Sequence, residues 1–228
     1  MAGEAALPPL RLVVALGNPG PEYALSRHNA GWQVADRALE CAAVACKAAW
    51  QPWNGELHVL QFGDDGRELM LLKPLTYMNA SGEAVQEVFG HFALSPGEML
   101  VVCDCLDLPC GRLRLRLNGS SGGQRGVKSV ADCLGTTDFP RLRIGIGRPE
   151  SADASIIDYV LSPWASGDEM KRLAALDRAA AAIRKSVETG VESAVEFCNA
   201  WRPPESPDEP APCSVTCGES KETKSGKV

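Results

Sequence analysis

The chain has 228 residues, of which 45% are hydrophobic, and a formal net charge of −6 at pH 7. This length suits one domain around one hydrophobic core, and the ordinary apolar content excludes a chain that is disordered throughout. The acidic balance argues against a protein that is basic all over, so contact with a polyanion would need a local basic surface.

Cysteines, histidines and apolar runs narrow the class further. The nine cysteines are odd in number and none has C-x-x-C spacing, which favours a reducing compartment over a disulfide framework. None of the three histidines pairs with a cysteine at zinc-ligand spacing, so we expect no metal. Residues 1–9 lack the basic start of a signal peptide, and no apolar run approaches the roughly 18–20 residues of a membrane span. We expect a soluble intracellular protein, cytoplasmic or in an organelle, without a membrane partner.

The predicted elements, in chain order, interleave strands with helices. Strands are expected at residues 10–17, 57–62, 68–73, 98–103, 112–117 and 141–147, and helices at residues 29–49, 81–92, 124–134 and, in one or two segments, 167–201. A Gly-Asp-Asp-Gly turn predicts a hairpin between the second and third strands, and Ser81 is a candidate N-cap. Alternating basic and apolar residues predict one wet face for each of the last two strands.

This order predicts a single α/β domain with a mixed, mostly parallel central sheet flanked by helices, over residues 10–202. Residues 1–9 form a short N-terminal extension. Residues 203–228 are rich in Pro, Ser and Glu and too poor in apolar groups to offset the entropy of ordering, so we expect a disordered tail.

Polar side chains gather where the first strand ends and the first helix begins. Residues 17–29 include Asn18, Tyr23 and His28, and the ligands of open α/β sheets bind at this rim. The positive end of the helix dipole would keep the His28 imidazole neutral, which is the form that acts as a base. A lone histidine more often caps a helix or packs, but so many polar neighbours favour a site.

Two further segments carry candidate groups. Asn79 lies in a loop that opens a helix, and Asp104 follows a hydrophobic strand on the same rim. A carboxylate there can hold the second ring nitrogen of a histidine and stabilise the imidazolium. Each residue could equally be a plain turn or cap residue. Asp104 and Asp107 could form an acid/base pair, but the Leu-Pro turn and the lack of sugar-binding aromatics disfavour a glycosidase.

A Gly-rich turn at residues 118–126 precedes a helix, where backbone N–H groups can cradle phosphate. It has neither the Walker A nor the G-x-G-x-x-G pattern, so a nucleotide-dependent enzyme is disfavoured and no cofactor is expected. Around it, residues 111–148 hold eight basic and two acidic residues, a charge of +6 against −12 for the rest of the chain. This stretch can bind phosphate locally, although a solvated strand face explains its charge at least as well.

Together these segments resemble one family. The chain carries, in order, the patterns G-N-P-G-x-x-Y-x-x-[ST]-R-H-N, P-x-T-[FY]-M-N-x-S-G, D-x-L-D-L-P-x-G, a Gly-rich turn, and R-L-R-I-G-I-G-R-P. This is the motif series of bacterial-type peptidyl-tRNA hydrolases, and its order and spacing match from about residue 10 to about residue 201. The first, second and last patterns are highly specific.

The resemblance implies a monomeric enzyme that hydrolyses the ester joining a peptide to the 3′ end of tRNA and so recycles tRNA from stalled translation. By position, His28 matches the catalytic histidine of the family and Asp104 the aspartate that supports it. Asn18 and Asn79 match residues that hold the substrate and its water. One base, one orienting carboxylate and amide donors toward the oxyanion suffice for an ester, because the ribose oxygen leaves easily.

The resemblance also implies residues that bind the two parts of peptidyl-tRNA. Tyr23 and Met78 match residues lining the pocket for the peptide and the terminal nucleotide. Arg114, Arg116 and Arg143 fall where the family grips tRNA phosphate with basic residues. Arginine suits this task because its planar guanidinium donates hydrogen bonds in pairs.

The Gly-rich turn departs from the family pattern, which usually reads G-G-H-x-G-H-N-G. Ser121 and Gln124 each replace a histidine, and Arg125 replaces an asparagine that helps to place the substrate and water. Arg125 cannot accept a hydrogen bond, but its long cation could bind the phosphate of the terminal nucleotide. Cysteines flank Asp104, where the family often has a polar or acidic residue.

These departures leave two hypotheses. The retained His28, Asp104, Asn18 and Asn79 favour an active hydrolase. Arg125 favours a catalytically weakened or inactive RNA-binding relative, for example an organellar RNA-splicing factor.

Overall fold

Seven strands form one mixed sheet in the order β2-β3-β4-β1-β5-β7-β6. The computed structural model describes residues 7–41, 47–50, 54–62, 66–151 and 153–205. The strands are β1 (Leu12–Ala15), β2 (Lys47–Trp50), β3 (Gly55–Phe62), β4 (Arg67–Pro74), β5 (Met99–Cys105), β6 (Leu113–Arg116) and β7 (Arg141–Gly145). The helices are α1 (Ala30–Cys41), α2 (Ser81–Phe92), α3 (Arg125–Leu134), α4 (Ile156–Leu161), α5 (Glu169–Thr189) and α6 (Val191–Asn199). Short 3-10 turns are η1 (Pro21–Tyr23), η2 (Arg27–Asn29), η3 (Met78–Ala80), η4 (Pro96–Glu98) and η5 (Ser166–Asp168).

The four central strands, β4, β1, β5 and β7, run parallel, whereas β3 and β6 run antiparallel to their neighbours β4 and β7. Every residue of β1 and β5 is buried. A parallel strand in the middle of a sheet has no wet face, which explains why both segments are continuous apolar runs in the sequence. The α/β class and the mixed sheet predicted from the sequence are confirmed.

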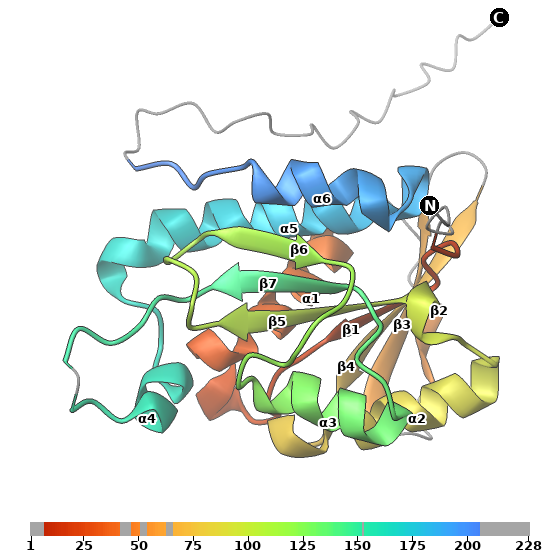
Figure 1. The fold of residues 1–228 in the computed structure, drawn as a ribbon, viewed down its shortest axis with the longest axis horizontal. Helices are drawn as coiled ribbons and strands as arrows, with labels where there is room; N and C mark the ends of the chain where they lie inside the picture. The colour runs from red at the N-terminus through yellow and green to blue at the C-terminus, as the bar shows by residue number, and fades with distance from the viewer. Residues whose placement is uncertain (1–6, 42–46, 51–53, 63–65, 152, 206–228) are drawn as a thin grey trace, which may run out of the picture.

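Helices cover both faces of this sheet (Figure 1). Helices α1, α5 and α6 pack on one face, and α2 and α3 pack on the other. One core cluster includes Val34 of α1 and Leu142 of β7, and the other includes Val88 of α2 and Val101 of β5. Successive residues of β1 contribute to the two clusters in turn, because neighbouring side chains of a strand point to opposite faces.

The start of α1 lies against the end of β1 and the middle of β5. A Cβ atom added to Gly31 would come within 2.5 Å of the carbonyl oxygens of Leu16 and Val102, so only glycine lets the helix approach this closely. The turn η2, which immediately precedes α1, therefore lies over the rim where parallel sheets bind ligands. The arrows of β5 and β7 in Figure 1 point toward α4, which borders the same rim.

The helix predicted at residues 29–49 is too long. Helix α1 ends at Cys41, residues 42–46 lie outside the described part of the chain, and Lys47–Trp50 is strand β2, antiparallel to β3. The helical spacing of the apolar residues from Trp32 to Leu39 predicted the helix, but pairing with the edge of β3 determines the structure of Lys47–Trp50.

Other elements agree more closely. Residue-by-residue pairing of β3 with β4 confirms the predicted hairpin, although its turn at residues 63–65 lies outside the described residues. The segment predicted at 167–201 is two helices, separated at Gly190, whose φ is +90°. Helix α4 was not predicted, because its six residues are too few for a clear helical period.

Two local predictions are wrong. Ser81 is the first residue of α2 rather than its N-cap, and its hydroxyl donates to the carbonyl oxygen of Met78 at 3.0 Å. Strand β7 does not have one wet face, because Arg141 is 3% exposed and donates to the carbonyl oxygens of Gly119 and Ser120. The Gly-rich turn thus covers part of the strand that alternation predicted to be wet.

The ends of the described chain pack on the domain. The backbone N–H of Leu7 donates to the carboxylate of Glu192 at 2.7 Å, and Pro204 is buried. Residues 206–228 lie outside the described residues, so the disorder of the tail stays a prediction. No helix in the described ranges has both the length and the apolar composition needed to cross a bilayer.

Free thiols occur at the five cysteines for which the structure describes the sulfur: Cys103, Cys105, Cys110, Cys133 and Cys198. Burial raises the pKa of the Cys198 thiol to about 12, so this side chain stays protonated and packs as a small apolar group.

The close approach at Gly31 gives a test of the fold. We predict that Gly31→Ala lowers the free energy of unfolding by about 1–3 kcal/mol, because the added methyl group must push α1 away from the backbone of two central strands. Gly90→Ala is the matched control, since its added Cβ atom in α2 meets nothing within 4 Å. The control should gain roughly 0.5–1 kcal/mol from helix propensity. Urea unfolding of both variants measures the difference, and equal stabilities would contradict the prediction.

Candidate active site

His28 and Asp104 form a hydrogen-bonded pair at the rim of the sheet. His28 is the middle residue of η2, and Asp104 lies near the carboxyl end of β5. Nδ1 of His28 is 2.9 Å from Oδ1 of Asp104, which is 3% exposed. A buried carboxylate needs hydrogen-bond donors, so Nδ1 carries a proton. In the neutral imidazole this leaves a lone pair on Nε2, which is the arrangement of a general base.

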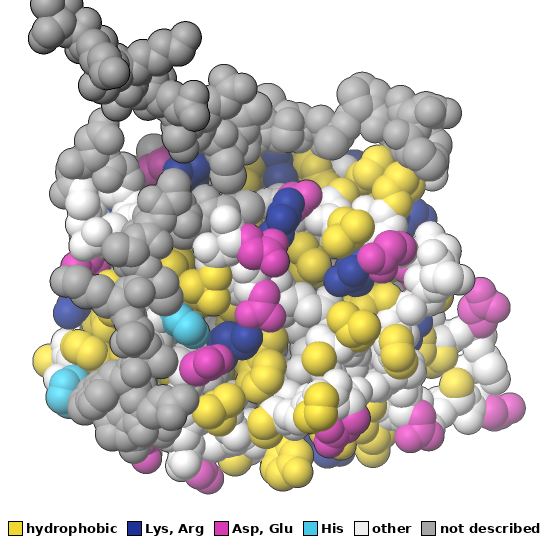
Figure 2. All heavy atoms as spheres, turned by 180° about the vertical axis from the view of Figure 1, so that it is seen from behind, with side chains coloured by type: hydrophobic (Ala, Val, Ile, Leu, Met, Phe, Trp, Pro, Cys, Tyr) yellow, Lys and Arg dark blue, Asp and Glu magenta, His cyan; other side chains and the backbone are white. Residues whose placement is uncertain are grey.

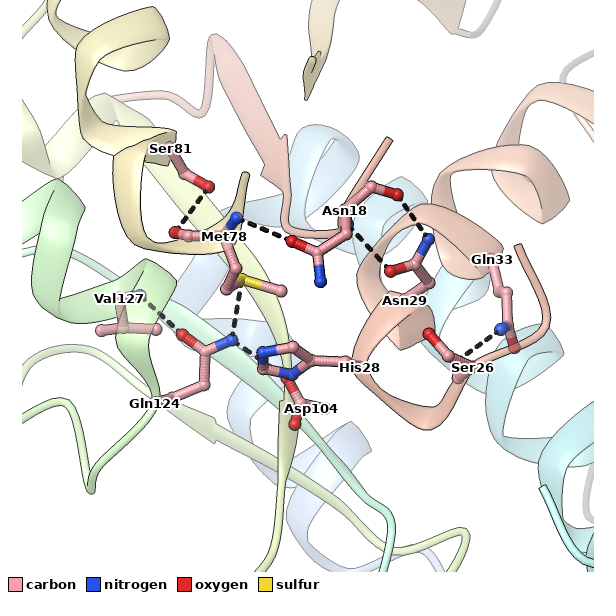
Figure 3. Close-up of polar contacts among 10 residues, drawn as sticks. All are labelled: Asn18, Ser26, His28, Asn29, Gln33, Met78, Ser81, Asp104, Gln124 and Val127. Atoms are coloured by element: carbon pink, nitrogen blue, oxygen red, sulfur yellow. Dashed lines mark hydrogen bonds and ion pairs between the residues drawn. The ribbon is translucent and has the colours of Figure 1, made fainter. Parts of the chain in front are cut away.

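Gln124 contacts the same carboxylate from the start of α3 (Figure 3). Its side chain is the N-cap of the helix, because the backbone N–H of Val127 donates to Oε1 at 2.7 Å. Nε2 donates to Oδ1 of Asp104 at 3.0 Å and lies 3.2 Å from the sulfur of Met78. One oxygen of Asp104 therefore accepts hydrogen bonds from both Gln124 and His28.

Asn18, just beyond the end of β1, is held by three hydrogen bonds. Its backbone N–H donates to Oδ1 of Asn29 at 2.8 Å, and Nδ2 of Asn29 donates to its carbonyl oxygen at 3.0 Å. The backbone N–H of Met78 donates to Oδ1 of Asn18, also at 2.8 Å. The side-chain oxygen is thereby used, and the amide NH₂ group points toward the His28 side of the site (Figure 3).

Asn18 and His28 border a pocket of about 250 Å³. The pocket is lined by Asn18, Tyr23, His28, Tyr77, Met78, Asn79, Arg125, Ile157, Val160 and Leu161. Six of them were singled out from the sequence, and Asp104 contacts the pocket indirectly, through His28. The walls are mostly apolar or aromatic with a few polar groups, which is the usual composition of a ligand pocket.

Arg27, the neighbour of His28, fixes α4 beside the pocket. Its guanidinium donates to the hydroxyl of Ser162 at 2.6 Å and to the carbonyl oxygen of Pro163, and lies 4.2 Å from the centre of the Tyr159 ring. The short helix is thus tied to the segment that carries His28. Its side chains on the pocket are Ile157, Val160 and Leu161.

Asn79 and Arg125 are the exposed polar residues of the pocket. Asn79 caps no helix, since the N-caps of η3 and α2 are Tyr77 and Ala80. Arg125 is the first residue of α3, and within the described part of the chain it forms no ion pair. An unpaired cation therefore lies beside the groups that surround His28.

Arg114, Arg116 and Arg143 do not line the pocket. Strand β6 alternates as predicted, with both leucines buried, Arg114 half-buried and Arg116 exposed. Arg143 of β7 lies opposite Arg114 in the sheet register. Its guanidinium is 3.8 Å from the carboxylate of Asp107 and packs close to Gly122. The edge of the sheet thus brings the three cations onto one face. Among the residues that the structure describes, Arg143 alone of the three has a carboxylate nearby, that of Asp107.

Asp107 belongs to this basic edge rather than to the pocket. Its carboxylate is 2.6 Å from Nη2 of Arg148 as well as near Arg143. It therefore forms ion pairs and does not act as a partner of Asp104, which removes the paired-carboxylate hypothesis. Among the described residues, no group of three or more His, Cys, Asp and Glu side chains could hold a metal ion.

Sequence reasoning missed the wall formed by Tyr77 and α4. A signal for the start of α4 was present, because Ser155 is a typical N-cap residue directly before apolar residues. In the structure the Ser155 hydroxyl accepts a hydrogen bond from the backbone N–H of Asp158 at 3.2 Å, as an N-cap does. The contact between Gln124 and Asp104 had no such signal, since 20 residues separate them.

Known proteins resemble the chain over most of its length. The sequence profile of the family described as peptidyl-tRNA hydrolase matches residues 12–206. The peptidyl-tRNA hydrolase of Aquifex aeolicus is 44% identical over 190 residues, which cover 83% of this chain and 96% of that protein. That of Symbiobacterium thermophilum is 45% identical over 189 residues, which cover 83% and 98%. The crystal structure of peptidyl-tRNA hydrolase from Acinetobacter baumannii aligns with a TM-score of 0.78 at 31% identity, over 88% of this chain and 100% of that one.

Proposed function

The chain belongs to the peptidyl-tRNA hydrolase family, and on this premise we propose that it hydrolyses the ester between a peptide and the 3′ end of tRNA, with His28 as general base. One observation carries the proposal. The Nδ1 atom of His28 is held 2.9 Å from the buried carboxylate of Asp104, beside a pocket that Asn18 and Asn79 also line.

The proposed reaction needs only these groups and water. Nε2 of His28 takes a proton from a water molecule while the water oxygen bonds to the ester carbonyl carbon. The electron pair of the carbonyl π bond moves onto its oxygen, to which the NH₂ group of Asn18 donates. The intermediate then breaks its bond to the ribose oxygen, which takes the proton from His28. Asp104 stabilises the imidazolium between the two transfers.

The remaining pocket residues bind the substrate in this proposal. Asn79 helps to hold the attacking water, and Tyr23 and Met78 contact the peptide and the terminal nucleotide. The apolar side chains of α4 suit a peptide better than a phosphate. In this proposal the enzyme acts as a monomer.

Phosphate of the tRNA is proposed to bind at Arg114, Arg116 and Arg143. Within the described residues, Arg114 and Arg116 form no ion pair or side-chain hydrogen bond, so their charge is available. Other cations are neutralised in pairs, for example Arg37 with Asp177. On the face that Figure 2 shows, basic and acidic side chains are interspersed rather than separated by sign. This contrast favours the edge at β6 for a polyanion.

An RNA-binding relative without catalysis is not the function we propose. Such a protein has no need of a histidine held by a buried carboxylate, and the relatives compared above are named as hydrolases. In the sequence, Arg125 favours this alternative. In the structure, however, Arg125 leaves the hydrogen bond between His28 and Asp104 intact.

We predict that His28→Ala lowers the hydrolysis rate by about 10²–10⁴-fold, because the base is lost, while tRNA affinity stays unchanged. His91→Ala, which removes an exposed histidine of α2, is the control and should be fully active. Single-turnover hydrolysis of a peptidyl-tRNA analogue gives the rates. A His28→Ala variant nearly as fast as the wild type would show that another group is the base.

Charge removal at the β6 edge should weaken tRNA binding with little effect on kcat. We predict that Arg114→Gln, Arg116→Gln and Arg143→Gln each raise KM and lower the slope of log affinity against log salt by up to about one unit. Arg37→Gln, which removes a cation that is already paired, should leave the slope unchanged. If all three slopes match the wild type, these arginines form a solvated strand face only.

Arg125 tests the departure from the family pattern. Arg125→Asn should raise kcat, because an asparagine adds a positioned donor and acceptor near His28, and one such donor can contribute about 10²–10³-fold. The same change should raise KM if the cation binds the terminal phosphate. Single-turnover rates and RNA affinities of the two proteins measure both effects. A variant slower than the wild type would mean that the arginine itself serves the reaction.

A further inference from the structure

We propose that Gln124 is a positioning residue, whose side-chain amide fixes Asp104 and, through Asp104, the imidazole of His28. The proposal rests on the proposed function, because it assigns Gln124 a part in the same reaction. Figure 3 shows Gln124, Asp104 and His28 together.

The amide of Gln124 has a single orientation. Its oxygen accepts from the backbone N–H of Val127 at 2.7 Å, and its nitrogen donates to the carboxylate of Asp104 at 3.0 Å. A flipped amide would place NH₂ against N–H and oxygen against carboxylate, so that both hydrogen bonds would become repulsions. Because the side chain is only 9% exposed, water cannot replace either partner easily. The start of α3 therefore fixes a donor against Asp104.

A second donor on the carboxylate changes what His28 can do. The terminal torsion of an aspartate is soft, so a single hydrogen bond lets carboxylate and imidazole turn together. Here Oδ1 of Asp104 accepts from both Nδ1 of His28 and Nε2 of Gln124, which fixes the carboxylate plane and hence the direction of Nε2 of His28. The amide does not titrate, so this support is the same at every pH at which the protein is folded.

Gln124 also connects the base to the amide donor on the other side of the pocket. Its nitrogen lies 3.2 Å from the sulfur of Met78, whose backbone N–H donates to Asn18. One side chain thus contacts both Asp104, which holds His28, and Met78, which holds Asn18. A positional error of about 1 Å at such a site can cost about 10²-fold in rate, so the loss of Gln124 should be measurable in kcat.

Gln124→Glu separates positioning from helix capping. The introduced carboxylate can still accept from the backbone N–H of Val127, so the cap at the start of α3 is kept and the change falls on the contact with Asp104. It cannot donate to Asp104, so kcat should fall by about 10–100-fold with KM unchanged. The rate relative to the wild type should recover as the pH falls, because protonation of the introduced group restores an O–H donor. Gln86→Glu, the same change on the exposed face of α2, is the matched control and should keep wild-type rates.

Gln124→Leu is the second variant, in case charge repulsion unfolds the first. It fills the same space without either hydrogen bond, and should lose both stability and kcat. A Gln124→Glu variant with wild-type kcat at every pH would overturn the proposal and leave Gln124 as a helix cap only. A loss of kcat that is the same at every pH would also overturn it.

A readout without substrate distinguishes failure of this proposal from failure of the proposed function. In the NMR spectrum, the Nδ1 proton of His28, assigned by its absence in His28→Gln, should exchange faster with water in Gln124→Glu than in the wild type. If the wild type hydrolyses no peptidyl-tRNA analogue, the proposed function fails, and this exchange rate still decides whether Gln124 holds the pair. Equal exchange rates in the two proteins would overturn the proposal.

Discussion

The carboxylate of Asp104 is the group on which the candidate site depends. It is 3% exposed, and a buried charge without partners is strongly destabilising. Its hydrogen bonds come from His28 before α1 and from Gln124 before α3. Three segments that are distant in the sequence must therefore meet for the charge to be satisfied. The same requirement that keeps the fold together at the rim also sets the geometry of the proposed base.

In the proposed function, two surfaces divide the recognition of peptidyl-tRNA between them: the pocket and the basic edge. The pocket offers a base, amide groups and an apolar wall from α4, which suit an ester and a peptide. The edge at β6 and β7 offers the guanidinium groups of Arg114 and Arg116, which suit phosphate. Strand β5 links the two surfaces, because it carries Asp104 and pairs with β7.

The errors of sequence-based prediction have specific physical causes. Residues 47–49 were predicted as the end of a helix from the spacing of apolar residues before them, but pairing with β3 makes them a strand. Arg141 has the spacing of a wet strand position, yet the backbone carbonyls of the Gly-rich turn satisfy its guanidinium, so it is buried. Helix α4 is too short for its period to be recognised, and Arg27 rather than helix length holds it in place. In each case a contact distant in sequence outweighs the local pattern.

The sequence by itself determined the α/β class, the hairpin, most helices and the family, because these depend on local periodicity and on short motifs. It also placed Asn18 and Asp104 at strand ends and His28 at the start of the first helix, where a shared rim follows from parallel topology. Only the tertiary structure decided that Gln124 supports Asp104, that α4 closes one side of the pocket, and that Arg143 is partly neutralised by Asp107. These contacts join residues tens of positions apart or depend on the direction of a side chain. No spacing along the chain encodes them, because distance and direction are set only when the segments pack.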